Sequence, residues 1–391
     1  MFKRLAAFAT SATLLMSVAL PASATNLEGK EAPSYANEQQ LAPQELIVHF
    51  NDSTKSTYAK ELVSKHGGKV IETTDEFMVV KVNGSVTEAI KVLEENSSVE
   101  YAEPNSMFHA NHVPNDPFYK TKQYAPQKVK AEQAWDVTQS NSSIKIAVID
   151  TGVDYNHPDL AGKVVKGYDF ADNDNDPMDE HYHGTHVSGI AAANTNNGIG
   201  IAGLSPNASI LAVRVLDESG SGSLDDVAQG IRYAADQGAQ VINLSLGGIL
   251  GSQTLKDAVN YAWNKGSVVV AAAGNESSPK PSYPAYYSNA IAVAATDQND
   301  TIAYYSNYGT WVDIAAPGSS VYSTMPGNSY DNLSGTSMAS PVVAGVAGLL
   351  AAQGRSASEI RTALEETADY ITGTGALFQN GRVNAANAVQ Y

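Results

Sequence analysis

Runs of apolar and β-branched residues recur along most of the chain and alternate with segments of helical periodicity. Apolar runs of strand length lie at Ile144–Ile149, Ile210–Leu216, Val241–Leu246, Val268–Ala273 and Ile291–Ala294. Helical patterns lie at His186–Asn194, Leu224–Gln237, Leu255–Asn264 and Ser358–Tyr370. Strands that are apolar throughout are buried on both faces, so their alternation with helices predicts an α/β fold, with a mainly parallel sheet between helices. In such folds the ligand site lies beyond the carboxyl ends of the strands.

The first residues have the pattern of a secretory signal. Lys3 and Arg4 precede the apolar run Leu5–Leu20, and the small residues Ala22-Ser23-Ala24 follow it. The alternative is a membrane anchor, but a spanning helix needs about 20 apolar residues, and this run of 16 is interrupted by threonine and serine. Residues 1–24 are therefore predicted to be a cleaved signal peptide, and the mature protein to be secreted, extracellular and without a membrane partner.

A change in composition near residue 111 divides the rest of the chain. Residues 25–111 are richer in charged side chains and contain no Trp. Their strand-like runs and helical pattern lie at Glu45–Phe50, Phe77–Val82 and Val86–Glu95. We expect a small α+β domain here and a larger domain over residues 112–391. The connection, Pro104–Pro117, is rich in Asn, Pro and His and is predicted to be exposed, where proteolytic cuts concentrate.

The composition narrows the possible partners. The chain has 24 Lys and Arg against 41 Asp and Glu, a net charge of −17. Such a chain repels nucleic-acid phosphates, and no basic run would hold it to anionic lipid. The absence of cysteine excludes disulfides, a thiolate nucleophile and Cys-ligated metal centres. The glycines of Gly198–Gly203 match the dinucleotide fingerprint, but no predicted strand precedes them, so nucleotide binding is not expected.

Four polar residues stand where the predicted fold can use them for catalysis. Asp150 ends an apolar strand, Asn275 follows another, and His183 and Ser337 each precede a helical pattern. A serine hydroxyl needs a base to remove its proton, and an imidazole needs a carboxylate to fix its tautomer. Simpler interpretations remain open for each residue alone. Ser337 could cap a helix, Asp150 could be an ion-paired strand end, and Asn275 could be a turn residue. His183 could bind a metal ion with His186.

With their neighbours, these residues resemble the motifs of the subtilisin family of serine proteases. The matching segments are Ile149-Asp150-Thr151-Gly152, His183-Gly184-Thr185-His186-Val187, Ala273-Gly274-Asn275 and Gly335-Thr336-Ser337-Met338-Ala339-Ser340-Pro341. The resemblance extends from about Pro114 to Tyr391 and is greatest to thermitase-type members. It implies a subtilisin-like three-layer fold in which Ser337 is the nucleophile and His183 the general base and then acid. Asp150 would orient the imidazole, and Asn275 would supply the side-chain half of the oxyanion hole.

The resemblance also implies how a peptide substrate binds. The segments that would pair with an extended substrate are Gly220, Ser221 and Gly222 together with Ser245, Leu246 and Gly247. Tyr283 and Pro284 would wall the primary specificity pocket. Broad endopeptidase activity favouring large apolar residues before the cut is therefore expected. Two departures from the family pattern are Tyr182, where Gly usually precedes the catalytic His, and Val342, where a His is usual.

Clustered carboxylates lead us to expect bound calcium. Asp169, Asp172, Asp174 and Asp176 fall within eight residues. Such charges repel one another unless a cation neutralises them, and Ca²⁺ prefers oxygen ligands, although a solvated acidic turn is the simpler alternative. By resemblance, Asp169, Asp172 and Asp174 with the carbonyls of Asp176 and Met178 form a medium-affinity site. A tighter site would join the side chains of Asp116, Asp159 and Asn197 to the carbonyls of Asn194, Ile199 and Ile201. A weaker third site, for Ca²⁺ or a monovalent ion, would use Asp313 with the carbonyls of Ala285, Tyr287 and Ala290.

Residues 25–111 resemble the subtilisin propeptide in position and pattern, which implies an intramolecular chaperone and inhibitor. The alternative is an accessory binding module. Met107 and Phe108 suit the expected specificity pocket, so autocatalytic cleavage is predicted between Phe108 and Val113, giving a monomeric protease of protein and peptide substrates. Two other functions for the whole chain would each leave a sign in the sequence. A serine esterase of the α/β-hydrolase type would need a Gly-x-Ser-x-Gly segment, which the chain lacks. A catalytically silent calcium-binding protein of the same fold would lack a triad member, and none is missing.

Overall fold

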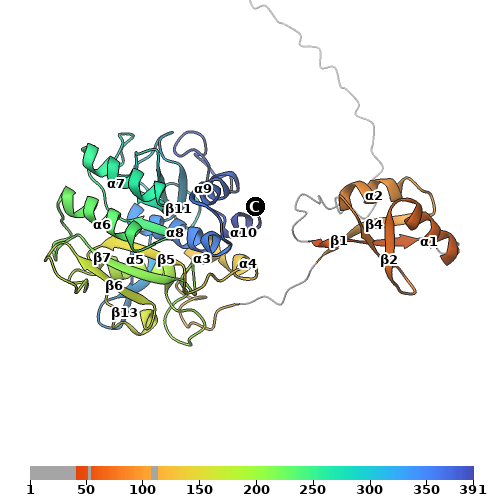
Figure 1. The fold of residues 1–391 in the computed structure, drawn as a ribbon, viewed down its shortest axis with the longest axis horizontal. Helices are drawn as coiled ribbons and strands as arrows, with labels where there is room; N and C mark the ends of the chain where they lie inside the picture. Colours follow the sequence, from red (N-terminus) through yellow and green to blue (C-terminus); the bar gives the residue numbers. More distant parts are fainter. Residues whose placement is uncertain (1–40, 52–53, 107–112) are drawn as a thin grey trace, which may run out of the picture. The chain divides into compact units, whose positions relative to one another are not determined.

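The chain forms two compact units, divided between Phe108 and His109 (Figure 1). The computed structural model describes residues 41–51, 54–106 and 113–391. The predicted signal peptide and residues 107–112, where the predicted cleavage falls, lie outside the described residues. Within the described ranges, no helix combines the length and apolar character needed to cross a membrane.

The N-terminal unit is a four-stranded antiparallel sheet with two helices, in the order β2-β3-β1-β4. Its elements are β1 (Leu41–Phe50), α1 (Ser56–Lys65), β2 (Gly68–Thr73), β3 (Met78–Val82), α2 (Val86–Glu94) and β4 (Val99–Ser106). Two helices, each between two strands, make an α+β unit, as predicted. Helix α1 and strand β2 were not predicted. Strand β2 is largely exposed along its length, so no buried apolar face reveals it.

Local sequence signals explain the elements of this unit that were predicted. Helix α2 begins after Ser85, whose Oγ accepts the Glu88 amide at 3.3 Å and satisfies one of the free N–H groups of the first turn. Val86, Ile90 and Leu93 then recur on one face and are buried. These side chains pack on the apolar residues of β1 and β3 in a small core of their own.

The second unit is built on a seven-stranded sheet in which every neighbouring pair is parallel, in the order β11-β10-β9-β8-β5-β7-β6. The strands are β5 (Lys145–Asp150), β6 (Val164–Asp169), β7 (Ser209–Arg214), β8 (Val241–Leu244), β9 (Val268–Ala272), β10 (Ala290–Thr296) and β11 (Ile314–Pro317). The five strands predicted from apolar runs are all present. Strands β6 and β11, at the two edges of the sheet, were missed, because β6 is partly exposed and β11 has only four residues.

Helices cover both faces of this sheet (Figure 1). They are α3 (Ala125–Lys128), α4 (Ala131–Trp135), α5 (His183–Ala192), α6 (Leu224–Asp236), α7 (Gln253–Asn264), α8 (Thr336–Ala352), α9 (Ala357–Glu366) and α10 (Ala385–Gln390), with the short η2 (Pro158–Leu160). In β5, Ile146 and Val148 join the core that contains α5 and α8, whereas Ala147 and Ile149 join the core of α6 and α7. Successive side chains of one strand thus enter opposite layers, which confirms the predicted three-layer α/β fold.

The carboxyl ends of the parallel strands meet along one edge of the sheet. Asp150 is the last residue of β5, and loops that begin at Val215, Ser245 and Ala273 follow β7, β8 and β9. A hairpin of β12 (Val321–Met325) and β13 (Ser329–Leu333) leads from this edge into α8. The edge therefore gathers all four residues singled out for catalysis.

Candidate active site

Asp150 and His183 form a direct pair at the end of β5. Asp150 is fully buried, and its Oδ1 lies 2.8 Å from Nδ1 of His183, the first residue of α5. The same oxygen accepts the Thr151 amide at 2.8 Å. An imidazole that donates its Nδ1 proton to a carboxylate leaves Nε2 free to accept a proton.

The surroundings of His183 favour its charged form. Burial alone would lower its pKa, but the charge and hydrogen bond of Asp150, with the charge of Asp179, outweigh burial and raise the pKa above the usual value. His186, one turn along α5, is different: burial lowers its pKa to about 4, and its Nε2 lies 3.1 Å from the carbonyl oxygen of Asp331. The two histidines therefore have separate partners and do not form a metal site together.

Asp179, which the sequence did not single out, fixes the loop before His183. It is buried and accepts four hydrogen bonds, from Thr151 Oγ1, Thr185 N, Thr185 Oγ1 and His181 N, at 2.6–3.0 Å. Tyr182 occupies the position where Gly is usual, with φ of 158°, and its ring stacks on His181 at 4.0 Å. Of these two rings it is His181 that lines the cleft described below.

Ser337 lies in the first turn of α8 and is joined to Ser245 by two hydrogen bonds. The Ser337 hydroxyl donates to the Ser245 carbonyl at 3.0 Å, and the Ser245 hydroxyl donates to the Ser337 carbonyl at 2.8 Å. Ser245 and His183 line the same cleft. In the described part of the chain the Ser337 hydroxyl thus has Ser245, not His183, as its acceptor. Catalytic hydrogen bonds often form only when substrate is bound.

Asn275 is positioned beside the Ser337 amide. Its Oδ1 accepts the backbone N–H of Thr336 at 2.8 Å and the Thr336 hydroxyl at 3.1 Å, which leaves Nδ2 as its donor. A side chain added at Gly335 would meet Asn275 Nδ2 and Ser337 N, each at 3.6 Å. Amides in the first turn of a helix have no acceptor within the helix. Two N–H donors therefore converge on one small space, as an oxyanion hole requires.

A cleft of about 580 Å³ lies beside these residues. All the predicted substrate-binding residues except Pro284 line it: Gly220, Ser221, Gly222, Ser245, Leu246, Gly247 and Tyr283. Its apolar part also includes Leu216, Leu224, Val227 and Leu255, which the sequence did not identify as binding residues. Their positions after β7 and in the first turns of α6 and α7 give no local signal, because only the sheet order brings them together.

The residues predicted for the tighter calcium site lie together. Asp159 is fully buried and accepts Asn197 Nδ2 at 2.7 Å and the Ile201 amide at 2.8 Å, and its own carbonyl accepts the Asn194 amide at 2.8 Å. Burial raises the pKa of both Asp159 and Asp116, and the charge of Asp116 raises the pKa of Asp159 further. Within the described ranges, Asp116 Oδ1 is buried without a hydrogen-bond partner, and neither carboxylate has a lysine or arginine ion-pair partner. This arrangement fits a bound cation.

Three of the four aspartates predicted for the medium site have cationic partners from the protein itself. The buried Arg214 contacts Asp169 Oδ2 at 2.7 Å and Asp172 Oδ2 at 2.6 Å through one nitrogen. Asp176 accepts the Tyr155 hydroxyl at 2.6 Å and lies 3.4 Å from Lys166 Nζ. Among the described residues, no three carboxylates or imidazoles converge on one point. An ion here would compete with Arg214, so the medium calcium site stays a prediction.

The weaker third site has a similar arrangement. Arg361 contacts Asp313 Oδ1 at 2.9 Å, and its other terminal nitrogen donates to the carbonyls of Ser288 at 2.7 Å and Ala290 at 3.3 Å. The Tyr287 carbonyl accepts the Ala290 amide at 2.8 Å. The Arg361 guanidinium thus occupies two of the oxygens proposed for an ion, those of Asp313 and Ala290, and this site also stays a prediction.

Comparison with known proteins agrees with this geometry. Residues 141–386 match the subtilase family, and residues 28–105 match the fervidolysin N-terminal prodomain. The chain is 52% identical over 401 residues to the thermophilic serine proteinase of Bacillus sp. (strain AK1), covering all of both chains. It is 66% identical over 280 residues to thermitase of Thermoactinomyces vulgaris, which covers 72% of this chain and 100% of thermitase.

A solved protease structure is also similar to this chain. A protease from Pseudoalteromonas arctica superposes with a TM-score of 0.65 at 34% identity, covering 71% of this chain and 99% of that protein. The family match, the two relatives and this likeness agree on the unit that carries Asp150, His183 and Ser337. The chain belongs to the subtilase family of serine proteases, and a prodomain precedes its protease unit.

Proposed function

We propose that the chain is a secreted serine endopeptidase, made as a zymogen, in which Asp150, His183 and Ser337 form the catalytic triad. The observation that carries the proposal is the 2.8 Å contact between buried Asp150 and His183 at the edge that also holds Ser337 and Asn275. The raised pKa of His183 supports its role as a base that is protonated during the reaction.

The proposed reaction has two halves. The Ser337 hydroxyl turns from the Ser245 carbonyl toward His183 Nε2 and gives up its proton as its oxygen bonds to the substrate carbonyl carbon. The negative charge that forms on the substrate oxygen is held by Ser337 N–H and Asn275 Nδ2, and His183 passes the proton to the leaving amine as the C–N bond breaks. Water then repeats the sequence on the acyl-enzyme and releases the acid, while Asp150 remains ionised.

The cleft supports a broad specificity with one apolar preference. Gly220–Gly222 and Ser245–Gly247 line the cleft, and backbone pairing of an extended substrate along these segments would depend little on side-chain identity. Leu216, Val227, Leu246 and Leu255 give the cleft apolar walls. We therefore propose that large apolar residues are favoured before the cut.

Calcium is proposed to stabilise the second unit through Asp116, Asp159 and Asn197, supported by the buried, unpartnered Asp116 Oδ1. Oxygen ligands of this kind suit Ca²⁺. When bound, the ion would neutralise two carboxylates whose burial is otherwise unfavourable. The N-terminal unit is proposed to act as inhibitor and folding aid until cleavage between Phe108 and Val113 releases the mature enzyme, which we expect to be monomeric.

Three measurements test the proposal. A fluorophosphonate probe should label the processed wild type and a Ser334→Ala control but not Ser337→Ala. Casein hydrolysis then separates a protease from an esterase. Sequencing the N-terminus of the secreted product should show that Ser337→Ala remains uncut at residues 108–113. Labelling or substantial casein hydrolysis by the Ser337→Ala protein would contradict the proposal.

A further inference from the structure

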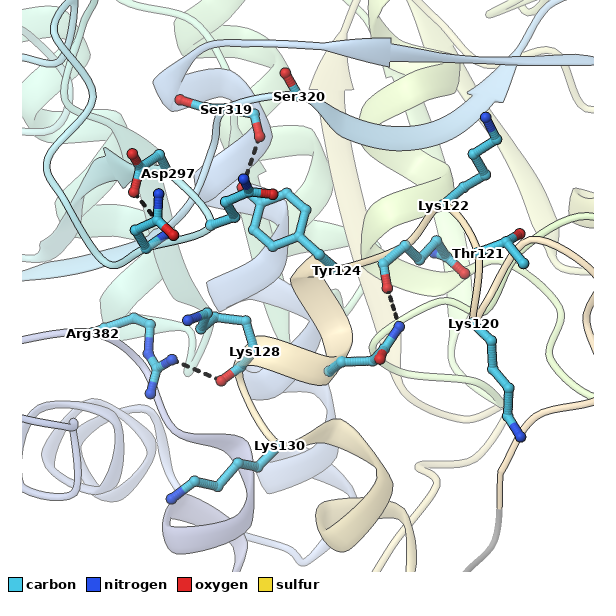
Figure 2. A pocket seen from close by; sticks show the side chains of 14 residues that line it. Lys120, Thr121, Lys122, Tyr124, Lys128, Lys130, Asp297, Ser319, Ser320 and Arg382 are labelled. Carbon is cyan, nitrogen blue, oxygen red and sulfur yellow. Dashed lines mark hydrogen bonds between the residues drawn. The ribbon is translucent and has the colours of Figure 1, made fainter.

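A second and larger cavity, of about 890 Å³, lies apart from the catalytic residues, and five of its 14 lining residues are basic (Figure 2). Its cations are Lys120, Lys122, Lys128, Lys130 and Arg382, and the carboxylate among its lining residues is Asp297. Five of the 24 lysines and arginines of a chain with net charge −17 thus surround one cavity. We refer to it as the basic pocket.

Part of this positive charge is compensated within the protein. Lys128 Nζ lies 3.3 Å from Asp300, and Arg382 pairs with Asp369 and donates to the Lys128 carbonyl at 2.7 Å. Lys130 lies 3.7 Å from Asp369. These groups form one wall of the basic pocket, and their positive charges are largely neutralised by Asp300 and Asp369.

Lys120 and Lys122 are different. Both side chains are exposed, and neither has an ionic or hydrogen-bonding partner among the described residues. In Figure 2 they lie on one side of Tyr124, with Lys128, Lys130 and Arg382 on the other. The one lining carboxylate, Asp297, is engaged as a turn acceptor, taking the amides of Asn299 at 2.8 Å and Thr301 at 3.0 Å. Two positive charges at the rim are therefore available to an outside group.

The sheet order relates the basic pocket to the catalytic residues. Along the carboxyl edge, the loops after β7, β5 and β8 line the substrate cleft, and Asn275 follows β9. Two residues that line the basic pocket come from the next loops: Asp297 is the first residue after β10, and Ser319 is the second residue after β11. The substrate cleft, the oxyanion donors and the basic pocket therefore come in that order along one edge.

Hydrogen bonds tie the wall of the basic pocket to the loop that carries the nucleophile. The Gly335 amide donates to the Gly318 carbonyl at 2.9 Å, and the Ser320 amide donates to Ser334 Oγ at 2.9 Å. Ser319 and Ser320 line the basic pocket, and Ser334 and Gly335 precede Ser337 by two or three residues. One wall of the basic pocket is therefore hydrogen-bonded to the loop that leads into Ser337.

We propose that the basic pocket binds acidic side chains of a polypeptide substrate on the leaving-group side of the cut. The inference rests on the proposed function, which puts the residues before the cut in the cleft. A chain that continues past the reacting carbonyl then runs along the same edge toward β10 and β11. Two separate ammonium groups at the rim suit an extended segment with several aspartates or glutamates better than a single small anion.

The test compares substrates that differ only beyond the cut. Two internally quenched peptides share all residues before the cut and the tail length, and carry either Asp and Glu or Asn and Gln downstream. Wild type should cleave the acidic tail with the higher kcat/KM, and Lys120→Gln/Lys122→Gln should reduce that preference by about threefold to tenfold, as two exposed ion pairs allow. The preference should also fall with added salt. The control variant, Lys256→Gln/Lys265→Gln, removes the same charge from α7 and its end and should keep it.

The outcomes separate this inference from the proposed function. If wild type cleaves both peptides with equal kcat/KM, or if the Lys120/Lys122 variant loses activity equally on both, the basic pocket does not bind substrate and the inference is wrong. If inorganic phosphate removes the preference at an ionic strength where chloride does not, the site takes simple anions and the inference is also wrong. If wild type cleaves neither peptide, the proposed function and the inference fail together.

Discussion

Replacing Asn275 by alanine should reduce activity and stability through two different atoms. Loss of Nδ2 removes one of two donors to the developing oxyanion, which typically lowers kcat by about 10²–10³-fold with little change in KM, because the donor acts mainly on the transition state. Loss of Oδ1 leaves the Thr336 amide and hydroxyl without the acceptor that they contact at 2.8 and 3.1 Å. Asn275 is exposed, so water replaces part of that bond, and we expect a loss of about 1 kcal/mol.

Two further variants separate these effects. Asn275→Asp keeps the acceptor and should retain stability, but its negative charge faces the oxyanion and should lower kcat at least as far as alanine does. Thr336→Val keeps the amide bond to Asn275 but removes both bonds of the hydroxyl, to Asn275 Oδ1 and from the Gly274 amide, and should lower stability with a much smaller loss of kcat.

The assay is steady-state kinetics on one peptide, with thermal unfolding measured in a Ser337→Ala background so that autolysis does not interfere. A loss of about 1 kcal/mol corresponds to about 2–4 °C in Tm for a unit of this size. The reasoning is refuted if Asn275→Ala keeps kcat within tenfold of wild type, or if Asn275→Asp is as active as wild type.

Three other predictions follow from the same geometry. His183 must be neutral to accept a proton, so kcat/KM should fall as pH drops through its raised pKa. Asp150→Asn removes the main charge that raises the pKa of His183, so the acid limb of the pH–rate profile should move to lower pH. The plateau value of kcat/KM should fall by about 10⁴-fold. A pH–rate profile that keeps its acid limb would contradict this cause. Chelation should lower the Tm of the mature enzyme, and about 2.7 kcal/mol of stability should be lost where free calcium had been 100-fold above its Kd. Asp116→Asn should abolish the dependence of Tm on calcium, and Asp172→Asn should leave most of it. A Tm that chelator does not change would contradict the proposed site. Arg214→Met leaves buried Asp169 without its partner and should cost about 3–5 kcal/mol in denaturant unfolding with chelator present. Added calcium should recover part of this loss, and a cost below about 1 kcal/mol would mean that the pair is not effectively buried.

The sequence was sufficient for the central part of the fold because that part obeys simple rules. Strands buried on both faces, such as β9 and β10, are nearly continuous apolar runs, which are typical of a covered parallel sheet. The edge strand β6 and the hairpin β12–β13 are partly exposed and carry mixed residues, so their pairing depends on neighbours that no local pattern reveals. Helix α1 was missed for a related reason, since only Ala59, Leu62 and Val63 are buried in it.

Long-range pairing also limited what the sequence could say about the site. The residues of the triad stand in recognisable motifs, and Asp150 and His183 are in contact as expected. Asp179 has no such motif, and its importance appears only when four donors from three residues are seen to surround it. Arg214 lies in a strand used for the family resemblance, yet its contacts with Asp169 and Asp172 join residues more than 40 positions apart. The acidic cluster was therefore interpreted without the cation that accompanies it.

Helix α8 ties the nucleophile to the most protected part of the molecule. From Thr336 to Ala351, only Ser337 is not buried, and the helix contacts both its neighbouring helices and the sheet. Amides in the middle of such an element exchange with solvent only when the whole unit opens. Ser337 itself lies in the first turn, but its neighbours Thr336 and Met338 are buried, so we expect this turn to open only with the rest of the unit. Heat inactivation should coincide with cooperative unfolding of the second unit, without a loosened, partly active form at lower temperature.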